Sequence, residues 1–447
     1  MKKFIDTIKN IWAIEDLRMR ILITMLFATI YRFGSFIVLP GIDPNVAQAT
    51  LESQADGNGL LNLLSMFSGG AFTHASIFAL GIMPYISASI VIQLLCVAVP
   101  SFQKIQREGE SGRRKINQYT RALTLLILLV QGPAYLINLR SQMGAAMPTL
   151  NWTMFLVTST IILAAGSMFI LWLGERITDK GIGNGVSLII MLGIIARLPQ
   201  AFGQEIVSRL NNMTGGGLVM FLIEIIVLFA VVIVAILLVQ GTRKVPVQYA
   251  KRVVGNQAVG GARQYIPLKV FAANVMPIIF AQALMFIPGI LARAIGGDAS
   301  PAAIALSNPQ GFWYNILSAL LIIAFTYFYT AITLNPVQMA EDMKRNNGFI
   351  PGVRPGKETA EYIDGIMSRI TFPGSLILAF IAIMPVFAGM FNVTREFAAF
   401  FGGTSLLILV GVVLDTLQQI ESHLLMRHYD GLLSSGRIHG RAGVNAY

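Results

Sequence analysis

The chain has 447 residues, of which 55% are hydrophobic and only 12% charged, and its formal net charge is +11. Its charged fraction is about half that of an ordinary soluble domain, and this excludes a soluble globular protein. The basic excess fits membrane topology and anionic lipid headgroups, so it does not by itself indicate nucleic-acid binding.

Residues 1–20 are expected to lie flat on the cytoplasmic membrane surface as an amphipathic segment. Its acidic residues and the lack of a small-residue cleavage site after the first apolar run argue against a cleavable signal peptide. Its apolar residues would share one helical face: Phe4, Ile5, Ile8, Ile11 and Trp12.

Long apolar stretches predict an all-α integral membrane protein with ten transmembrane helices. The expected spans are 21–40, 75–99, 119–139, 152–174, 184–203, 216–240, 270–291, 313–334, 370–391 and 401–427.

A short apolar piece at 60–67 stands before the second span, and Ser68, Gly69 and Gly70 separate the two. Eight residues are about a third of the length that crosses a bilayer. The ends of such a half-helix could not be satisfied in lipid, so it must lie inside protein or line a cavity. The pattern predicts a re-entrant half-helix, and the glycine pair indicates that it can move.

Lysine and arginine gather in alternate loops, at the N-terminus and after spans 2, 6 and 8. The opposite loops carry only isolated arginines, among them Arg140 and Arg209. Positive loops mark the cytoplasmic side, so both termini are expected there, including a tail at 428–447, and an even number of spans is required. The loops at 241–269 and 334–369 are longer than orientation needs, which suggests a docking platform for a large acidic or RNA-containing partner.

The chain divides into two halves of five spans, 21–203 and 216–427, joined by a connection at 204–215 that we expect to act as a hinge. Two halves with an odd number of spans have opposite orientations, so an inverted, pseudo-symmetric repeat is permitted.

The residues resemble those of the SecY family, whose members form the central subunit of the bacterial protein-conducting channel. The resemblance runs nearly end to end. Its densest segments are RFGSFIVLPGID (32–43), MFSGGAFTHASIFALGIMPYISASIVIQLL (66–95), EGESGRRKINQYTR (108–121), LGERITDKGIGNGVSLII (173–190), PVQYAKR (246–252), NPVQMAEDMKR (335–345), FIPGVRPGKET (349–359) and FGGTSLLILVGVVLD (401–415).

The resemblance implies a pore ring of aliphatic side chains, which would yield to a passing polypeptide and exclude ions by dewetting at rest. Val186 stands where isoleucine is usual in the family. The implied ring is Ile82, Ile86, Val186, Ile190, Ile279 and Ile408. Ile82 and Ile86 are one helical turn apart and would point the same way. The half-helix at about 60–72 would be a plug beneath this ring. The plug residues singled out are Leu60, Leu64, Phe67, Gly69 and Gly70.

Spans 2 and 7 would form a lateral gate, through which a hydrophobic segment leaves for the lipid. Four polar residues on these spans could latch it, because polar groups at membrane depth pair across helices: Ser87, Gln93, Asn274 and Gln282. Ordinary packing between helices is the competing interpretation for each of them.

Basic residues of the two long loops are expected to contact a motor protein or the ribosome. Arg354 lies between Pro–Gly pairs that favour a projecting turn. The set is Arg243, Lys244, Lys251, Arg252 and Arg354. The resemblance further implies the small membrane subunits SecE and SecG, the SecA motor ATPase, the ribosome, signal peptides and nascent chains, and anionic lipids as partners, in the bacterial plasma (inner) membrane.

A secondary transporter with inverted repeats is the alternative function. Such a protein needs ionisable residues at the membrane midplane, and the few candidates lie mostly near span ends: Arg32, Glu224, Asp415 and Glu421. An intramembrane enzyme fits less well, because the sequence contains no HExxH and GNGVS at 183–187 lacks the second glycine of GxSxG. We expect no catalytic residue, metal, cofactor or nucleotide-binding loop, so energy must come from a partner.

Overall fold

The computed structural model describes residues 12, 14–42, 68–72, 74–143, 151–211, 217–249, 252–254, 257–259, 263–271, 276–281, 284–285, 301, 305, 311–391 and 393–434. The chain divides into two compact units. The first comprises Met1–Ala88, Tyr119–Ala196 and Val412–Tyr447, and the second comprises Ser89–Gln118 and Arg197–Gly411.

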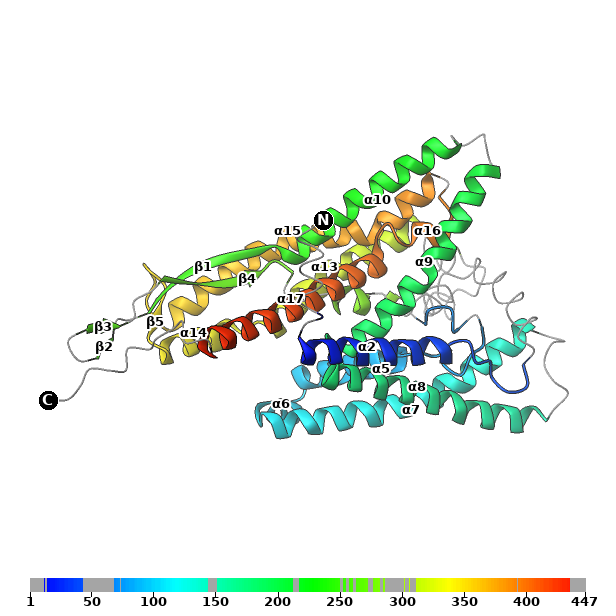
Figure 1. Cartoon of the computed structure of the whole chain (residues 1–447), viewed down its shortest axis with the longest axis horizontal. Helices are drawn as coiled ribbons and strands as arrows, with labels where there is room; N and C mark the ends of the chain where they lie inside the picture. The colour runs from blue at the N-terminus through cyan, green and yellow to red at the C-terminus, as the bar shows by residue number, and fades with distance from the viewer. Residues whose placement is uncertain are drawn as a thin grey trace. The chain divides into compact units, whose positions relative to one another are not determined.

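The described elements are mostly helices, as the sequence predicts (Figure 1). The helices in chain order are α2 (Glu15–Gly34), α5 (Met83–Ala98), α6 (Pro100–Arg107), α7 (Glu110–Met143), α8 (Trp152–Lys180), α9 (Gly185–Asn211), α10 (Gly217–Gln240), α13 (Phe312–Thr333), α14 (Pro336–Arg345), α15 (Lys357–Met390), α16 (Arg395–Ala398) and α17 (Gly403–Ser434). The boundaries between the two units fall inside α5, α7, α9 and α17.

Seven helices of the described residues are long and apolar enough to cross a membrane, and α5 with α6, bent by 104° at their junction, could form an eighth span. These correspond to predicted spans 2 to 6 and 8 to 10. Span 1 corresponds to α2, whose first turn carries Glu15 and Asp16. Only part of span 7 lies within the described residues. The chain is a multi-pass membrane protein, and ten spans are consistent with this structure.

The first two spans differ from their predicted boundaries. α2 ends at Gly34, and α5 begins only at Met83, not at residue 75. Ala75 and Gly81 have φ of 47° and 54°, a left-handed conformation that a right-handed helix does not contain. Residues 37–39 instead pair with residues 75–77: Leu39 N–H donates to the Ala75 carbonyl and Ile77 N–H to the Ile37 carbonyl, both at 2.9 Å.

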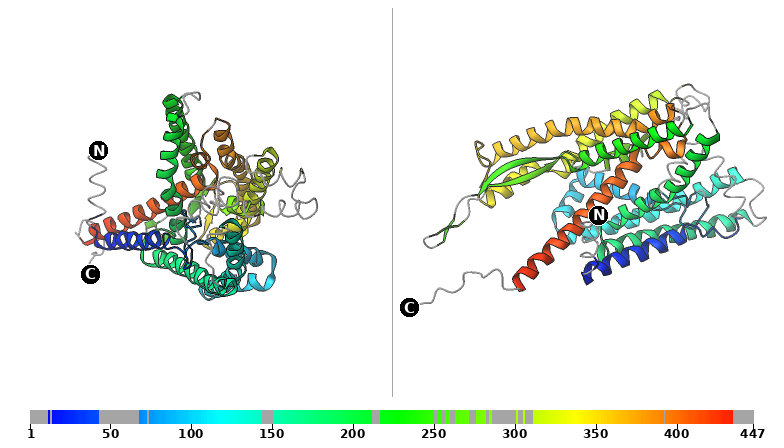
Figure 2. Two further views of the ribbon diagram at one scale, coloured as in Figure 1. Left: turned by 90° about the vertical axis from the view of Figure 1, so that its right-hand side faces the viewer. Right: turned by 45° about the horizontal axis from the view of Figure 1, so that its top comes forward.

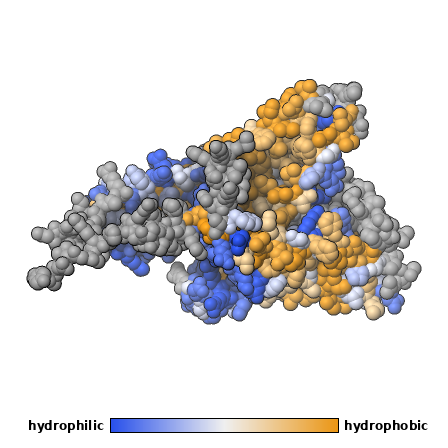
Figure 3. All heavy atoms as spheres, in the orientation of Figure 1, coloured by the Kyte–Doolittle hydropathy of each residue, from blue (hydrophilic) through white to orange (hydrophobic). Residues whose placement is uncertain are grey.

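An apolar stripe runs along one side of α10 and stays exposed in this chain. It consists of Val219, Leu222, Ile226, Phe229, Ile233 and Leu237, each at least 55% exposed. In Figure 3 the region of α10 is mostly orange, whereas the region of α6 and the start of α7 is blue. A stripe with helical spacing that finds no protein partner among the described residues is suited to lipid.

The loop predicted at 241–269 is a β-hairpin. β1 (Thr242–Tyr249) pairs antiparallel with β4 (Arg263–Lys269), and in a separate pair β2 (Arg252–Val254) pairs with β3 (Gln257–Val259). β1 also pairs with β5 (Gly348–Phe349), so the three-stranded sheet has the order β4–β1–β5. The second predicted loop, 334–369, likewise contains α14, β5 and the start of α15. Figure 2 shows the long hairpin of β1 and β4 extending from the end of α10, alongside α15.

The inner face of this sheet is buried against α14 and α15. Val245 and Val247 alternate with exposed residues on β1, as expected for a strand with one buried face. They form a core with side chains of the neighbouring elements: Leu268, Met343, Ile350, Ile363 and Met367. The two basic loops therefore form one folded surface.

Candidate functional site

The described end of the predicted plug, residues 68–72, is held firmly by its neighbours in the first unit. Arg32 Nη1 donates to the Gly69 carbonyl at 2.8 Å, and the Tyr135 hydroxyl donates to the Phe72 carbonyl at 3.1 Å. Ser68 Oγ accepts the Phe72 N–H at 3.0 Å. Bonds of this kind satisfy the backbone of a buried segment that is not helical.

Gly69 lies with its backbone against the backbone of α9. It has φ of 64°, and a Cβ at this position would lie 2.8 Å from the Gly193 Cα. Only glycine combines this backbone conformation with this close approach. Gly69 is therefore an anchor of this segment in the structure, and the mobility of the glycine pair stays a prediction. Leu60, Leu64 and Phe67 lie outside the described residues.

The predicted pore residues are buried or half-buried, and they come from both units. Ile82, Ile86 and Ile190 are buried in the first unit and Val186 is half-buried there. Ile408 is buried and Ile279 half-buried in the second unit. Their closure into one ring stays a prediction.

The start of α9, which carries two of these residues, is fixed by a close helix contact. A Cβ on Gly185 would lie 1.9 Å from the Gly174 carbonyl oxygen of α8, and a Cβ on Gly174 would lie 3.3 Å from Val186 Cγ2. Backbone contact at these glycines sets the rotation of α9 about its axis. The side chains of Val186 and Ile190, one turn apart, are thereby fixed in direction.

Gln93, one of the predicted gate residues, bonds to a residue that the sequence did not single out. Its Oε1 accepts a hydrogen bond from the hydroxyl of Tyr329 on α13, and its Nε2 donates to Ser89 Oγ at 3.2 Å. Ser87 is half-buried on α5. The other two predicted gate residues, Asn274 and Gln282, lie outside the described residues.

The predicted docking residues lie on the β1–β4 hairpin and its extension β2–β3, and on the turn beside the sheet. Arg243 and Lys244 are exposed on β1, and Arg252 lies on β2; Lys251 is outside the described residues. The Arg354 side chain is 87% exposed, with Nη1 3.8 Å from Glu358 Oε1. An exposed ion pair of this kind contributes little to stability, so the guanidinium is available to a partner.

The turn that presents Arg354 is well defined. Thr359 Oγ1 donates to the Arg354 carbonyl at 2.8 Å. Gly352 and Gly356 on either side have φ of 88° and 113°, which non-glycine residues rarely adopt. This local geometry follows from the PGVRPG sequence.

A buried ionic cluster in the second unit was missed by sequence reasoning. Arg209 Nε donates to Glu205 Oε1 at 2.8 Å and Nη2 to Glu224 Oε1 at 2.5 Å. All three residues are at most 5% exposed. The other Glu205 oxygen accepts the Thr394 N–H at 2.8 Å, and Arg209 Nη2 also donates to the Phe391 carbonyl at 3.2 Å. The sequence predicts Arg209 in a loop after a span that ends at residue 203. In the structure Arg209 lies on α9, because this helix continues to Asn211.

This cluster also explains why an acidic residue, Glu224, is buried in an apolar helix. Its carboxylate, a candidate for ion coupling in a transporter, is paired with a buried arginine. In the sequence, only the spacing of Glu205 and Arg209, one helical turn apart, could have indicated this ionic cluster. The third member, Glu224, comes from a different helix, α10.

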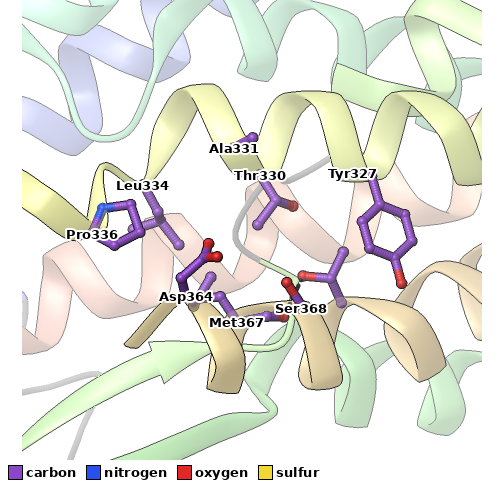
Figure 4. A pocket seen from close by; sticks show the side chains of 9 residues that line it. Tyr327, Thr330, Ala331, Leu334, Pro336, Asp364, Met367 and Ser368 are labelled. Atoms are coloured by element: carbon purple, nitrogen blue, oxygen red, sulfur yellow. Dashed lines mark hydrogen bonds between the residues drawn. The ribbon is translucent and has the colours of Figure 1, made fainter. Parts of the chain in front are cut away.

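A small cavity lies between α13 and α15 and has a volume of about 70 Å³. Figure 4 shows Asp364 and Ser368 of α15 facing Thr330 of α13 and Leu334, the residue that follows this helix. Sites for small molecules usually have about 300–1,000 Å³. This cavity has room for a few waters and is too small for a metabolite or a nucleotide.

Known proteins give a consistent identification. The SecY family matches residues 76–417. The protein translocase subunit SecY of Halalkalibacterium halodurans is 43% identical over 436 residues, covering 96% of this chain and 99% of the relative.

Two solved structures share the fold. One, described as a protein-conducting channel, superposes with a TM-score of 0.60 at 19% identity over 91% of this chain and 92% of the other. Sec61 in the canine ribosome–channel complex from the endoplasmic reticulum gives 0.54 at 17% identity, with coverage of 91% and 92%. With a full-length relative well above 30% identity, this chain belongs to the SecY family.

Proposed function

We propose that this chain is the channel through which unfolded secretory polypeptides cross the plasma membrane and from which transmembrane segments pass sideways into lipid. The observation that carries the proposal is 43% identity to a protein translocase subunit over 96% of the chain. The transporter alternative is not favoured, because Glu224 is engaged in a buried ion pair.

The proposed pore is the aliphatic ring, and the proposed seal is the plug. Flexible apolar side chains can yield to a chain of any sequence and close around it, whereas a narrow apolar throat dewets and blocks ions. The buried positions of Ile86 and Ile408 are compatible with this role. The anchor at Gly69 would hold one end of the proposed plug against α9.

The proposed partners supply the energy for transport. No energy source is expected in the sequence, so a motor ATPase of the SecA type or the ribosome would supply it from the cytoplasmic side. The surface formed by the β1–β4 hairpin and the Arg354 turn is the proposed contact. The canine Sec61 channel, which shares this fold, was solved in a ribosome–channel complex, and this supports a ribosome as a partner here. We further propose SecE and SecG as companion subunits, and the inner membrane with both termini cytoplasmic.

The test is reconstitution of the purified complex in vesicles with a motor ATPase and a preprotein. Ile408→Ser should wet the constriction and raise resting ion conductance, whereas Ile408→Leu retains an apolar side chain of the same size and should leave the seal intact. Vesicles that import no preprotein would refute the channel proposal, and equal leakage by the two variants would refute dewetting at this ring.

A further inference from the structure

The side chain of Gln93 is oriented by Tyr329. The amide uses its oxygen to accept from the Tyr329 hydroxyl and its nitrogen to donate to Ser89, which fixes the direction of the amide. Tyr329 itself is 8% exposed. At membrane depth a phenol hydroxyl without a partner is costly, so this bond specifies the position of α5 relative to α13.

The ring of the same tyrosine packs against the helical stretch 276–281, which belongs to predicted span 7. The ring centroids of Tyr329 and Phe280 are 5.2 Å apart at an angle of 60°, a favourable tilted arrangement. Phe280 is 2% exposed, and it also stacks on Phe325 of α13 at 5.6 Å. Tyr329 therefore contacts, with its two ends, the elements on both sides of the predicted lateral gate.

We propose that Tyr329 is the positioning residue of that gate. Its hydroxyl holds Gln93 on span 2 while its ring packs on Phe280 of span 7, and both contacts together stabilise the closed gate. When span 2 moves away from residues 276–281, Tyr329 loses one contact or the other. The proposal rests on the proposed function and adds to it a residue of span 8.

The hydroxyl alone can be removed by Tyr329→Phe, which preserves the ring. An interhelical hydrogen bond in a membrane protein typically changes an equilibrium about threefold. We expect Tyr329→Phe to raise export of a preprotein with a defective signal sequence about threefold relative to export of the normal preprotein. Gln93→Leu should do the same, and the double variant should gain no more than either single variant. Tyr327→Phe, on the same helix and outside this contact, is the matched control.

The ratio between export of the defective preprotein and export of the normal one distinguishes an effect on gating from a loss of stability, because a damaged channel exports less of both preproteins. An unchanged ratio, additive gains in the double variant, or a uniform loss of both substrates with a lower yield of the complex would each overturn the assignment. Failure of the wild-type complex to export the normal preprotein would instead contradict the proposed function.

Discussion

Arg209 is the residue whose removal should damage the second unit most. Replacing Arg209 by methionine leaves the carboxylates of Glu205 and Glu224 buried side by side without their shared cation. Breaking a buried ion pair from one side costs about 3–5 kcal/mol, and here two anions lose their partner. The bond to the Phe391 carbonyl, which joins α9 to the end of α15, is lost as well.

The two glutamates should differ when each is changed to glutamine. Glu205 uses both oxygens, one for Arg209 and one for the Thr394 N–H. Glu224 uses one, and its Oε2 has no hydrogen-bond partner among the described residues. Because an unsatisfied buried oxygen is already unfavourable, Glu224→Gln should destabilise the protein less than Glu205→Gln.

The assay is thermal unfolding of the purified complex in mild detergent, followed by intrinsic fluorescence. Arg140→Met is the control, since Arg140 is exposed and stacks on Trp152 at 4.3 Å. The triple replacement of Glu205 and Glu224 by glutamine and of Arg209 by methionine removes every charge and should be more stable than Arg209→Met alone. Two results would contradict this role of the buried cluster: unfolding of Arg209→Met at the temperature of Arg140→Met, or a triple variant that unfolds at a lower temperature than Arg209→Met.

Two further predictions concern the plug and the docking surface. Gly69→Ala places a methyl group 2.8 Å from the Gly193 Cα and should raise resting ion conductance in planar bilayers; Gly365→Ala, with open space around it, is the control, and equal conductance would contradict the anchor. Arg354→Glu should abolish motor-driven export without lowering the unfolding temperature, because the side chain is 87% exposed and charge reversal acts on docking. Normal export, or the same loss with Lys357→Glu, would contradict a specific role.

The apolar spans could be predicted from sequence because a membrane imposes length and composition on each helix. The predicted span at 216–240 and α10 at Gly217–Gln240 agree almost to the residue. The boundaries failed at residues 75–82, where hydropathy remains high although Ala75 and Gly81 leave the helical region of φ. Hydropathy reports burial in lipid or protein and does not distinguish a helix from buried turns.

The β1–β4 hairpin and the partners of the polar side chains could not be predicted from the sequence, because they depend on tertiary structure. Pro246 and the basic residues of β1 are untypical of a central strand, and the segment forms one because β4 and β5 pair on both sides of it. Gln93 was identified from its polarity, but its partner Tyr329 lies far away in the chain. Composition identifies polar residues in apolar segments, and only the packing of helices determines which of them meet.

The short pairing of β5 with β1 has a mechanical consequence. A load applied to the turn around Arg354 enters α15 directly through the bond between Arg354 and Thr359, and it enters the hairpin through the residue pairs Gln248–Phe349 and Tyr249–Gly348. α15 has 34 residues, so it acts as a rod about 50 Å long. Its far end meets Phe391, whose carbonyl is bonded to Arg209. A push on the exposed turn is thus delivered to the buried Arg209 near the end of α9, and Pro373 and Pro385 are the two places where the rod can yield.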